Sequence, residues 1–583
     1  MFFNYKESFE LDPSVWLSVI WHGIKLDLSA GAYIMIIPVL VLGIFSVFNE
    51  SLIFIFIKIY TLIILLIVLF LGVADMELYT YWGFKLDITP LIYLKTPKDA
   101  FASVSFIEIG LLLLFFGILF YSWYWIYRKF IHVSFMNIYK RSVFFSIISP
   151  FLLAFLFIPL RGGLGITPVN ISSVFFHTNR FANHSSVNVL WNSVYSIVDR
   201  KKLKTSYKFM EEVKANELFT GLYPEENFGV KVIKEKSNIM LFILESFSNR
   251  IIGELGGYPG ITPELDKLCR NSMVFSNFFA TGDRSNKGIV GILSGFPAQP
   301  TTSIINYPSK TQDLPFLLRP FHDDGYFTAF YYGGDINFAN FKSYFTNEAM
   351  DKIITVHDFP SELKKQEWGV PDEYLFEKIL AEADTIKSPF FIYCFTLSSH
   401  EPFDIPGKPF FGSGTIDERS KSGFYYTDKC IGKFMEKAKT KAWWDNTLII
   451  ILSDHGNRYP GFIPNHVKEK FQIPMIWTGG AVLNPDTVIS KYSSQTDLPV
   501  TLLRQFGYEH DGYNYSKDIF DSQTSSFAMY FFNNGFGFMS DSTSLIFDNS
   551  INKFILQKGK NISFYQEVSK AYLQKLSGDF YSR

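Results

Sequence analysis

Residues 448–456 read Leu-Ile-Ile-Ile-Leu-Ser-Asp-His-Gly, an unbroken apolar run followed by three polar residues and a glycine. Residues 239–246 have the same pattern, because Ile-Met-Leu-Phe-Ile-Leu is followed by Glu-Ser. Short continuous apolar runs of this kind, rich in branched and aromatic residues, are typical of strands that are buried on both faces of a sheet. Both stretches therefore predict buried strands whose carboxyl ends carry polar groups.

Further apolar runs of the same kind occur at wide intervals in this part of the chain. They are Met273 to Phe279, Phe327 to Tyr332, Phe390 to Leu397 and Ile473 to Trp477. Segments of helical length and pattern lie between the runs, such as Pro263 to Asn271 and Tyr426 to Thr440. Strands that alternate with helices predict an α/β domain with a mostly parallel sheet, in which functional groups gather at the carboxyl ends of strands.

The N-terminal part of the chain is much more apolar. A transmembrane helix needs about 20 mainly apolar residues, because lipid offers no hydrogen-bond partner to the backbone. Four stretches meet this requirement, and Lys58 and Glu108 are the charged residues within them. The stretches run from about Ala30 to Phe48, Leu52 to Val73, Phe106 to Tyr127 and Ser142 to Leu160.

The charges in the loops predict how these helices are oriented. The loop between the third and fourth stretches carries Arg128, Lys129, Lys140 and Arg141 and no acid, whereas acids balance the lysines of the loop from Ala74 to Ser105. By the positive-inside rule, the first of these loops is cytoplasmic and the chain after about Leu160 lies outside. The N-terminus is then external, or an upstream span is missing from the sequence.

We therefore expect a transmembrane helical domain at residues 1–162, a connector at 163–236 and an extracytoplasmic catalytic domain at 237–583. The formal net charge of -1 gives no field that would attract nucleic acid. The cysteines, Cys269, Cys394 and Cys430, have no metal-ligand or redox spacing, so we expect packed thiols.

The polar residues after the predicted strands indicate a metal site. Glu245 follows the first strand, and Asp454 and His455 follow the strand that begins at Leu448. Carboxylate and imidazole groups at separate strand ends can converge on one divalent cation, such as Mn²⁺, Mg²⁺ or Zn²⁺. We therefore predict that these three residues bind one metal ion.

Ser285 is the candidate nucleophile. It lies in Thr281-Gly282-Asp283-Arg284-Ser285-Asn286-Lys287-Gly288, which leads into the helical pattern of Ile289 to Leu293. The N-terminus of a helix stabilises an anion, and a metal bound to the hydroxyl oxygen would favour the alkoxide. Taken alone, such a serine is usually a helix cap and an Asp-His pair a turn, but their joint occurrence after strands of one sheet favours an active site.

Several motifs, in this order, resemble one known family. They are the apolar N-terminal stretches, Arg161-Gly162-Gly163 with Pro168-Val169-Asn170, the strand ending in Glu245, Gly282 to Ser285 with Gly291 to Pro300, and Ser453 to Gly456. Over nearly its whole length the chain resembles the lipoteichoic acid synthase-like branch of the alkaline phosphatase and sulfatase superfamily. The resemblance implies an alkaline phosphatase/sulfatase-like α/β domain after a transmembrane helical bundle.

The resemblance also implies a mechanism. In that family a metal, often manganese, is bound by an acid, a nucleophilic threonine and an Asp-His pair, which resemble Glu245, Ser285, Asp454 and His455. A phospholipid headgroup is transferred through a covalent phospho-enzyme, and here serine replaces the usual threonine. His400, in Ser399-His400-Glu401-Pro402-Phe403, looks like the family's substrate-side histidine, which would hold a phosphate oxygen or protonate the leaving alkoxide.

Residues around the site are further candidates for binding substrate: Arg284, Asp335, Asn340 and His466, with Gln495-Thr496-Asp497 at the edge of the pocket. Family members that transfer glycerophosphate carry Trp and Arg after the third strand, whereas this chain reads Gly-Gly-Asp-Ile-Asn-Phe-Ala-Asn at 333–340. The headgroup, of the phosphoglycerol or phosphoethanolamine type, is therefore left open.

We expect a metal-dependent phospholipid headgroup transferase in a bacterial inner membrane, with Mn²⁺ the favoured ion and Zn²⁺ or Mg²⁺ as alternatives. The donor is a membrane phospholipid, while the glycan or lipid acceptor is unknown. Two other interpretations remain open, a sulfatase or phosphodiesterase-type hydrolase and a non-catalytic lipid sensor of the same fold. A true sulfatase is disfavoured because no C/S-x-P-x-R motif surrounds Ser285.

Overall fold

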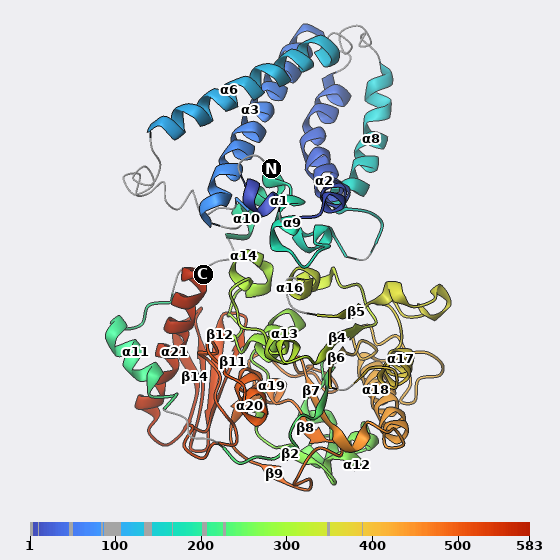
Figure 1. Ribbon diagram of the computed structural model, residues 1–583, viewed down its shortest axis with the longest axis vertical. Helices are drawn as coiled ribbons and strands as arrows, with labels where there is room; N and C mark the ends of the chain where they lie inside the picture. Colours follow the sequence, from blue (N-terminus) through green and yellow to red (C-terminus); the bar gives the residue numbers. More distant parts are fainter. Residues whose placement is uncertain are drawn as a thin grey trace. The chain divides into compact units, whose positions relative to one another are not determined.

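The computed structural model describes residues 4–9, 11–45, 50–82, 85–86, 106–132, 143–165, 167–200, 207–224, 229–346, 350–387 and 389–583. The chain divides into two compact units, Met1–Leu203 and Lys204–Arg583. The expected architecture is confirmed, because long apolar helices make up most of the first unit and an α/β domain makes up most of the second (Figure 1).

Four long helices dominate the first unit, and within the described residues each contains a stretch long and apolar enough to cross a membrane. The first helix begins at Pro13, well before the start predicted at Ala30, and residues 46–49 at its predicted end lie outside the described residues. The four helices are α2 (Pro13–Phe45), α3 (Glu50–Trp82), α6 (Phe106–Ile126) and α8 (Val143–Arg161). Shorter helices are α1 (Tyr5–Phe9), η1 (Tyr127–His132), η2 (Ile171–Val174), α9 (Arg180–Ser185) and α10 (Val189–Arg200).

Helices α2 and α8 pack closely because small polar residues lie between them. Ser146 Oγ donates to the carbonyl of Gly43 at 2.7 Å, and Ser29 Oγ donates to the carbonyl of Leu160 at 3.0 Å. A side chain at Gly43 would collide with Ser149. Small residues allow helix backbones to approach in lipid, where apolar side chains gain little from contacting one another.

The second unit is built on an eight-stranded mixed sheet of order β5-β4-β6-β1-β7-β8-β2-β9. Its five strands from β5 to β7 are parallel, whereas β8 is antiparallel to both β7 and β2. The strands are β1 (Asn238–Leu244), β2 (Met273–Phe275), β4 (Phe327–Tyr332), β5 (Lys352–Ile354), β6 (Phe390–Phe395), β7 (Thr447–Ser453), β8 (Met475–Thr478) and β9 (Val488–Ile489).

Helices cover both faces of this sheet, as predicted. On one face, a continuous apolar core joins β1, β6 and β7 to α12 (Pro263–Cys269), α17 (Asp372–Ala383) and α18 (Ile416–Ala438). On the other face, Phe321 of α15 (Leu318–Asp323) lies 5.0 Å from Phe391 of β6 between ring centroids. The other α-helices between Ser285 and Phe506 are α13 (Ser285–Ser294), α14 (Pro308–Thr311), α16 (Phe341–Thr346), α19 (Lys468–Phe471) and α20 (Leu498–Phe506).

Two segments differ from the sequence predictions. The run Met273 to Phe279 forms two strands, because β2 ends at Phe275 and β3 (Phe278–Phe279) pairs with β10 (Ser493–Ser494) in a separate small sheet. The helix predicted from Tyr426 begins ten residues earlier, at Ile416, where the hydroxyl of Thr415 accepts a hydrogen bond from the amide of Glu418. That capping box satisfies amides that would otherwise have no partner at the helix start.

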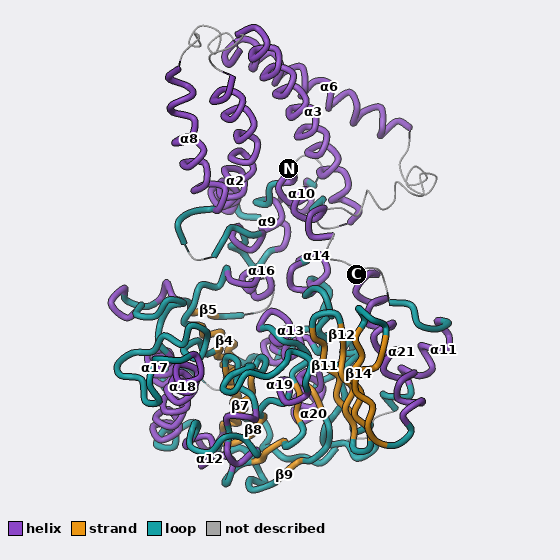
Figure 2. The backbone as a smooth tube through the Cα atoms, turned by 180° about the vertical axis from the view of Figure 1, so that it is seen from behind, coloured by secondary structure: helices purple, strands orange, loops and turns teal. Residues whose placement is uncertain are grey.

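An antiparallel sheet follows the main sheet in sequence, and the sequence analysis did not foresee it. Figure 2 shows its strands beside α21 (Ile562–Ser582), which in turn contacts α11 (Glu212–Thr220). The hydroxyl of Ser577 and the carboxamide of Gln574, both on α21, accept backbone hydrogen bonds from residues 207–210. The strands are β11 (Phe527–Phe532), β12 (Gly535–Ser540), β13 (Thr543–Asp548) and β14 (Lys553–Gly559).

A buried ion pair joins this second sheet to the main domain. Lys517 Nζ lies 2.6 Å from Asp497 Oδ2, and each side chain is only 1% exposed. The same ammonium donates to the carbonyl of Phe527 on β11 at 3.0 Å. Asp497 ends the 3-10 turn η10 (Gln495–Asp497), so the pair fixes this turn against β11.

Replacing Lys517 with methionine should lower the free energy of unfolding by about 3–5 kcal/mol, because the Asp497 carboxylate would stay buried without its partner. The measurement is denaturant unfolding of the full chain in detergent. Lys231→Met is the matched control, since the Lys231–Glu235 pair is exposed to solvent and its loss should change stability little. Equal effects of the two substitutions would contradict the assigned role of the buried pair.

Candidate metal centre and catalytic site

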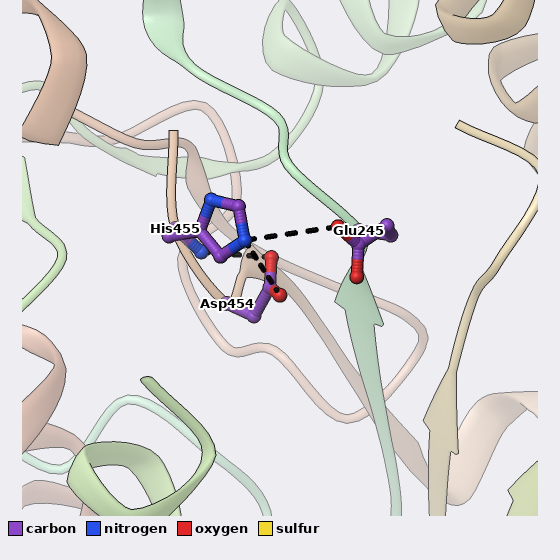
Figure 3. A group of neighbouring side chains, drawn as sticks. All are labelled: Glu245, Asp454 and His455. Atoms are coloured by element: carbon purple, nitrogen blue, oxygen red, sulfur yellow. Dashed lines mark hydrogen bonds and ion pairs between the residues drawn. The ribbon is translucent and has the colours of Figure 1, made fainter. Parts of the chain in front are cut away.

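The register of two parallel strands brings the predicted ligands together. Leu244 of β1 pairs with Ser453 of β7, so both strands end at the same level of the sheet. Glu245 follows β1, and Asp454 and His455 follow β7. One ligand atom from each of these three residues lies within 4.8 Å of the others, and Figure 3 shows their side chains converging.

The group is buried and compact. Glu245 is 2% exposed and Asp454 is 0% exposed. His455 Nε2 lies 3.7 Å from Glu245 Oε1 and 3.4 Å from Asp454 Oδ2. The three residues therefore offer two carboxylates and one imidazole to a single point, which is a ligand set that suits Mn²⁺ or Zn²⁺.

The two oxygens of Asp454 differ in a way that fits a bound cation. Oδ1 accepts hydrogen bonds from the amide of Ser246 at 2.8 Å and from the amide of His455 at 2.7 Å. Oδ2 is buried and has no hydrogen-bond partner among the described residues. A buried carboxylate oxygen without a donor is costly unless a cation binds it, so Asp454 is held in the orientation that a metal ligand requires.

The electrostatics of the three residues also indicate that a cation is needed at this point. Burial raises the pKa of Glu245 to about 8, and the charge of Asp454 acts in the same direction. His455 opposes this rise, but one imidazole does not balance two carboxylates. A divalent cation at this point would allow both carboxylates to stay ionised at neutral pH. Glu245, Asp454 and His455 are therefore a candidate metal site.

Ser285 lies beside this group at the first position of α13. Its side chain is buried, and its Oγ donates to Glu245 Oε2 at 3.3 Å. Gly288, on the first turn of the same helix, lies against the loop after β7, because a Cβ there would be 1.9 Å from the carbonyl oxygen of Asp454. The structure thus brings the predicted nucleophile to the candidate metal ligands by direct backbone contact.

A network of buried and half-buried polar groups surrounds Asp283, two residues before the nucleophile. Lys287 Nζ lies 3.0 Å from Asp283 Oδ1, Asn465 Nδ2 donates to Asp283 Oδ2 at 3.2 Å, and Lys470 Nζ donates to Asn465. Although burial opposes it, the charges of Lys287 and Lys470 hold the pKa of Asp283 below its usual range. Arg284, the next residue, is exposed.

This cluster has more cations than acids. Burial lowers the pKa of Lys470 to about 8, and Asp283 partly opposes that effect while the charges of Arg284, Arg458 and Lys287 add to it. Positive charge is therefore concentrated around Asp283, two residues before Ser285. Such a field favours an anionic substrate next to the nucleophile.

His400 is held in one tautomer by the loop after β6. Its Nδ1 lies 2.7 Å from the carbonyl oxygen of Glu401, and a carbonyl only accepts, so Nδ1 carries the hydrogen. Burial lowers the pKa of His400, which keeps the ring neutral and leaves Nε2 as its unprotonated nitrogen. The hydroxyl of Ser399, the residue before His400, donates to the carbonyl of Glu245 at 2.7 Å, so His400 lies near the site.

Trp368 was missed by the sequence analysis. Its ring centroid lies 4.5 Å from that of His400, and its Nε1 donates to the same Glu401 carbonyl at 2.9 Å. A bridge between Gly334 and Gly369 brings this segment to the loop after β4. No local sequence signal marks Trp368, because it follows no strand and belongs to no motif.

The remaining candidates for binding substrate are described by their local contacts and backbone conformation. Asp335 accepts hydrogen bonds from the amide and side chain of Asn337, as in an Asx turn. Asn340 is buried in a left-handed conformation with φ 62°. The His466 ring lies 6.2 Å from that of Phe532. The roles of Asp335, Asn340 and His466 in binding substrate stay predictions.

Comparison with known proteins connects this geometry to a family. Residues 237–508 match the sulfatase family. Lipoteichoic acid synthase 2 of Bacillus subtilis is 24% identical over 311 residues, which cover 48% of this chain and 46% of that protein. Lipoteichoic acid synthase of Staphylococcus saprophyticus is 25% identical over 393 residues, or 61% of this chain and 59% of that protein. The chain thus aligns with roughly half the length of these relatives.

Solved structures share the fold of the second unit. A protein of the alkaline phosphatase superfamily from Vibrio parahaemolyticus matches with a TM-score of 0.57 and 24% identity over 64% of this chain and 97% of its own. A lipoteichoic acid synthase from Listeria monocytogenes matches with a TM-score of 0.52 and 19% identity over 63% of this chain and 98% of its own. Residues 237–508 therefore form a sulfatase-family domain, and the chain, which carries apolar helices in its N-terminal part, is related to lipoteichoic acid synthases.

Proposed function

We propose that this chain is a metal-dependent enzyme that transfers a phospholipid headgroup at the outer face of the membrane through a phospho-enzyme on Ser285. The observation that carries the proposal is the hydrogen bond from Ser285 Oγ to Glu245, since Glu245 also belongs to the candidate metal site. A nucleophile, a metal ligand and a helix N-terminus thus meet at one point, which is the arrangement that phosphoryl transfer requires.

The reaction divides into two displacements at phosphorus. First, Ser285 Oγ bonds to phosphorus, the bond to the diacylglycerol oxygen breaks, and the serine proton passes to that oxygen. Second, an acceptor hydroxyl bonds to phosphorus, the Ser285 Oγ bond breaks, and the acceptor proton returns to the serine. A divalent ion held by Glu245, Asp454 and His455 would supply Lewis acidity that favours the Ser285 alkoxide.

His400 is suited to exchanging protons in these steps. Because its Nδ1 hydrogen is engaged by the carbonyl of Glu401, Nε2 is the ring atom that is available to a substrate. Its lowered pKa keeps Nε2 able to accept the proton of an incoming hydroxyl at neutral pH. Arg284, Asp335, Asn340 and His466 are proposed to contact the substrate.

The cations near Ser285 support a substrate with a phosphate group. Arg284, Lys287 and Lys470 are opposed there by Asp283, so the surroundings of the nucleophile keep an excess of positive charge. The apolar helices support a donor that resides in the membrane, and the predicted orientation puts residues 237–583 outside the cytoplasm. Manganese is the favoured ion, with zinc or magnesium as alternatives.

A phosphodiesterase would use the same site with water as the acceptor, so the products distinguish it from a transferase. A sulfatase is disfavoured because Asn286-Lys287-Gly288 follows Ser285 in place of the motif that yields formylglycine. A non-catalytic lipid sensor is disfavoured because the three metal ligands and the serine remain together.

Ser285→Ala should abolish the first displacement. We expect the full chain, given Mn²⁺ and fluorescent phosphatidylglycerol or phosphatidylethanolamine in micelles, to release diacylglycerol, and the variant to be slower by about a thousandfold or more. Ser294→Ala is the matched control, because Ser294 lies at the far end of α13 and bonds to Tyr344. The preferred lipid would identify the headgroup.

Undiminished turnover by Ser285→Ala would rule out the phospho-serine. Release of free headgroup phosphate with the diacylglycerol, and no acceptor-linked product even with glycerol or glycan acceptors present, would identify a hydrolase. Absence of turnover with either lipid and every metal would leave the sensor interpretation.

Mn²⁺ should stabilise the protein through Glu245, Asp454 and His455. At a free ion concentration of about one hundred times Kd, the free energy of unfolding should rise by about 2.7 kcal/mol. Asp454→Asn should lose most of this rise. Asp428→Asn should retain it, because the buried Asp428 carboxylate accepts amides of Glu264 and Leu265 at the start of α12. A rise that survives in Asp454→Asn would place the ion elsewhere.

The pH profile of kcat/KM should reflect the lowered pKa of His400. Since burial favours the neutral ring, the acidic limb that His400 contributes should lie below the ordinary pKa of histidine. His400→Gln should remove that limb, whereas His322→Gln should keep it, because His322 lies beside Asp351 at the opposite end of β4. An acidic limb that is unchanged in His400→Gln would exclude this role.

A further inference from the structure

Gln495 links the two loops that carry the candidate site without being one of the candidate ligands. It lies in η10 and is 0% exposed. Its Nε2 donates to the carbonyl oxygens of Ser453 and Asp454, each at 2.7 Å. Its Oε1 accepts the amide hydrogen of Thr281 at 2.9 Å. One carboxamide therefore joins the loop with the metal ligands to the loop that leads to Ser285.

The two loops also contact each other directly. The carbonyl oxygen of Asp454, which accepts from Gln495, is the atom that a side chain at Gly288 would strike. Gly288 follows Ser285 by three residues, so it shares the first turn of α13. The position of this carbonyl is thus set by Gln495 and by the helix that carries the nucleophile.

Gln495 is itself held by the surrounding structure. Asp497, two residues later, accepts the amide of Ser494 at 2.8 Å and pairs with Lys517. The carbonyl of Asp497 also accepts the hydroxyl of Thr501 on α20 at 2.7 Å. The carboxamide therefore projects from a fixed turn, and its hydrogen bonds act between rigid partners.

We propose that Gln495 is a positioning residue that holds Asp454 and His455 at their working separation from Ser285. The inference rests on the proposed function, because that separation matters only if the metal and the serine act on one phosphorus. A carboxamide suits this position because one end donates two hydrogen bonds while the other accepts one. Residues of this kind orient metal ligands, and their loss weakens metal affinity about 10–100-fold.

Gln495→Met tests the proposal, since methionine has a similar length and cannot replace these hydrogen bonds. We expect the Kd for Mn²⁺, measured by calorimetry on the full chain in detergent, to weaken by about tenfold or more. At saturating Mn²⁺, kcat should remain lower than in the wild type while KM changes little, because the serine stays displaced from the ion.

Gln505→Met is the matched control for stability. Gln505, on α20, is 1% exposed, accepts the amide of Val232 at 2.8 Å and donates to the carbonyl of Val230 at 2.9 Å. Losing these bonds should lower the melting temperature, just as losing the hydrogen bonds of Gln495 should. The Kd for Mn²⁺ should nevertheless stay within about twofold of the wild type, because the Gln505 bonds do not touch the site loops.

Gln495→Glu provides a second variant if the methionine variant does not fold. An ionised carboxylate keeps an acceptor for Thr281 but places negative oxygen against two carbonyls, so Mn²⁺ affinity should again fall by about tenfold. Unchanged affinity in the folded Gln495 variants would overturn the proposal, as would an equal loss in Gln505→Met.

The Mn²⁺ titration separates this inference from the proposed function. Weakened binding in the Gln495 variants, combined with a wild type that turns over neither lipid, would show that Gln495 places the candidate metal ligands and would reject the enzyme. Normal turnover with normal Mn²⁺ affinity in those variants would support the enzyme and reject the positioning role. A wild type that binds none of Mn²⁺, Zn²⁺ and Mg²⁺ would overturn both.

Discussion

The arrangement of the second unit depends on two carboxylates, Glu245 and Asp454, buried next to each other at the ends of parallel strands. Each ion removed from water costs several kcal/mol, and the repulsion between them adds to that cost. His455 and the amides that bond to Asp454 offset only part of it. A fold that accepts this cost is explained most simply by a cation that draws both carboxylates together.

The sequence was sufficient to predict those elements whose structure follows from their local residue pattern. Strands β1, β4, β6 and β7 lie within two residues of their predicted bounds, because branched and aromatic runs suit strands buried on both faces. The same rule placed Glu245, Asp454 and His455 at one edge of the sheet, since parallel strands in register end together. The apolar helices were equally visible, because lipid demands long uninterrupted runs.

Other parts depend on contacts between distant segments and have no local signal. Trp368 reaches His400 only because Gly369 bridges to Gly334. Gln495 joins two loops that both precede it in the chain, one by about forty residues and the other by more than two hundred, and its neighbours predict only a turn. The split of Met273 to Phe279 follows from the pairing of Phe278 and Phe279 with β10, a partner over two hundred residues later.

For the proposed headgroup transfer, charge and aromatic surface would come from different segments of the chain. The loop after β4 has no cation at 333–340, so positive charge comes instead from the loop of Ser285, with Arg284 and Lys287. The aromatic surface comes from Trp368. Its ring packs on that of His400, and both side chains bond to the carbonyl of Glu401. We expect a phosphate to approach the nucleophile loop and the organic part of a headgroup to contact the indole. Charge and shape would thus be recognised by separate segments, so that each can change without displacing the candidate metal ligands.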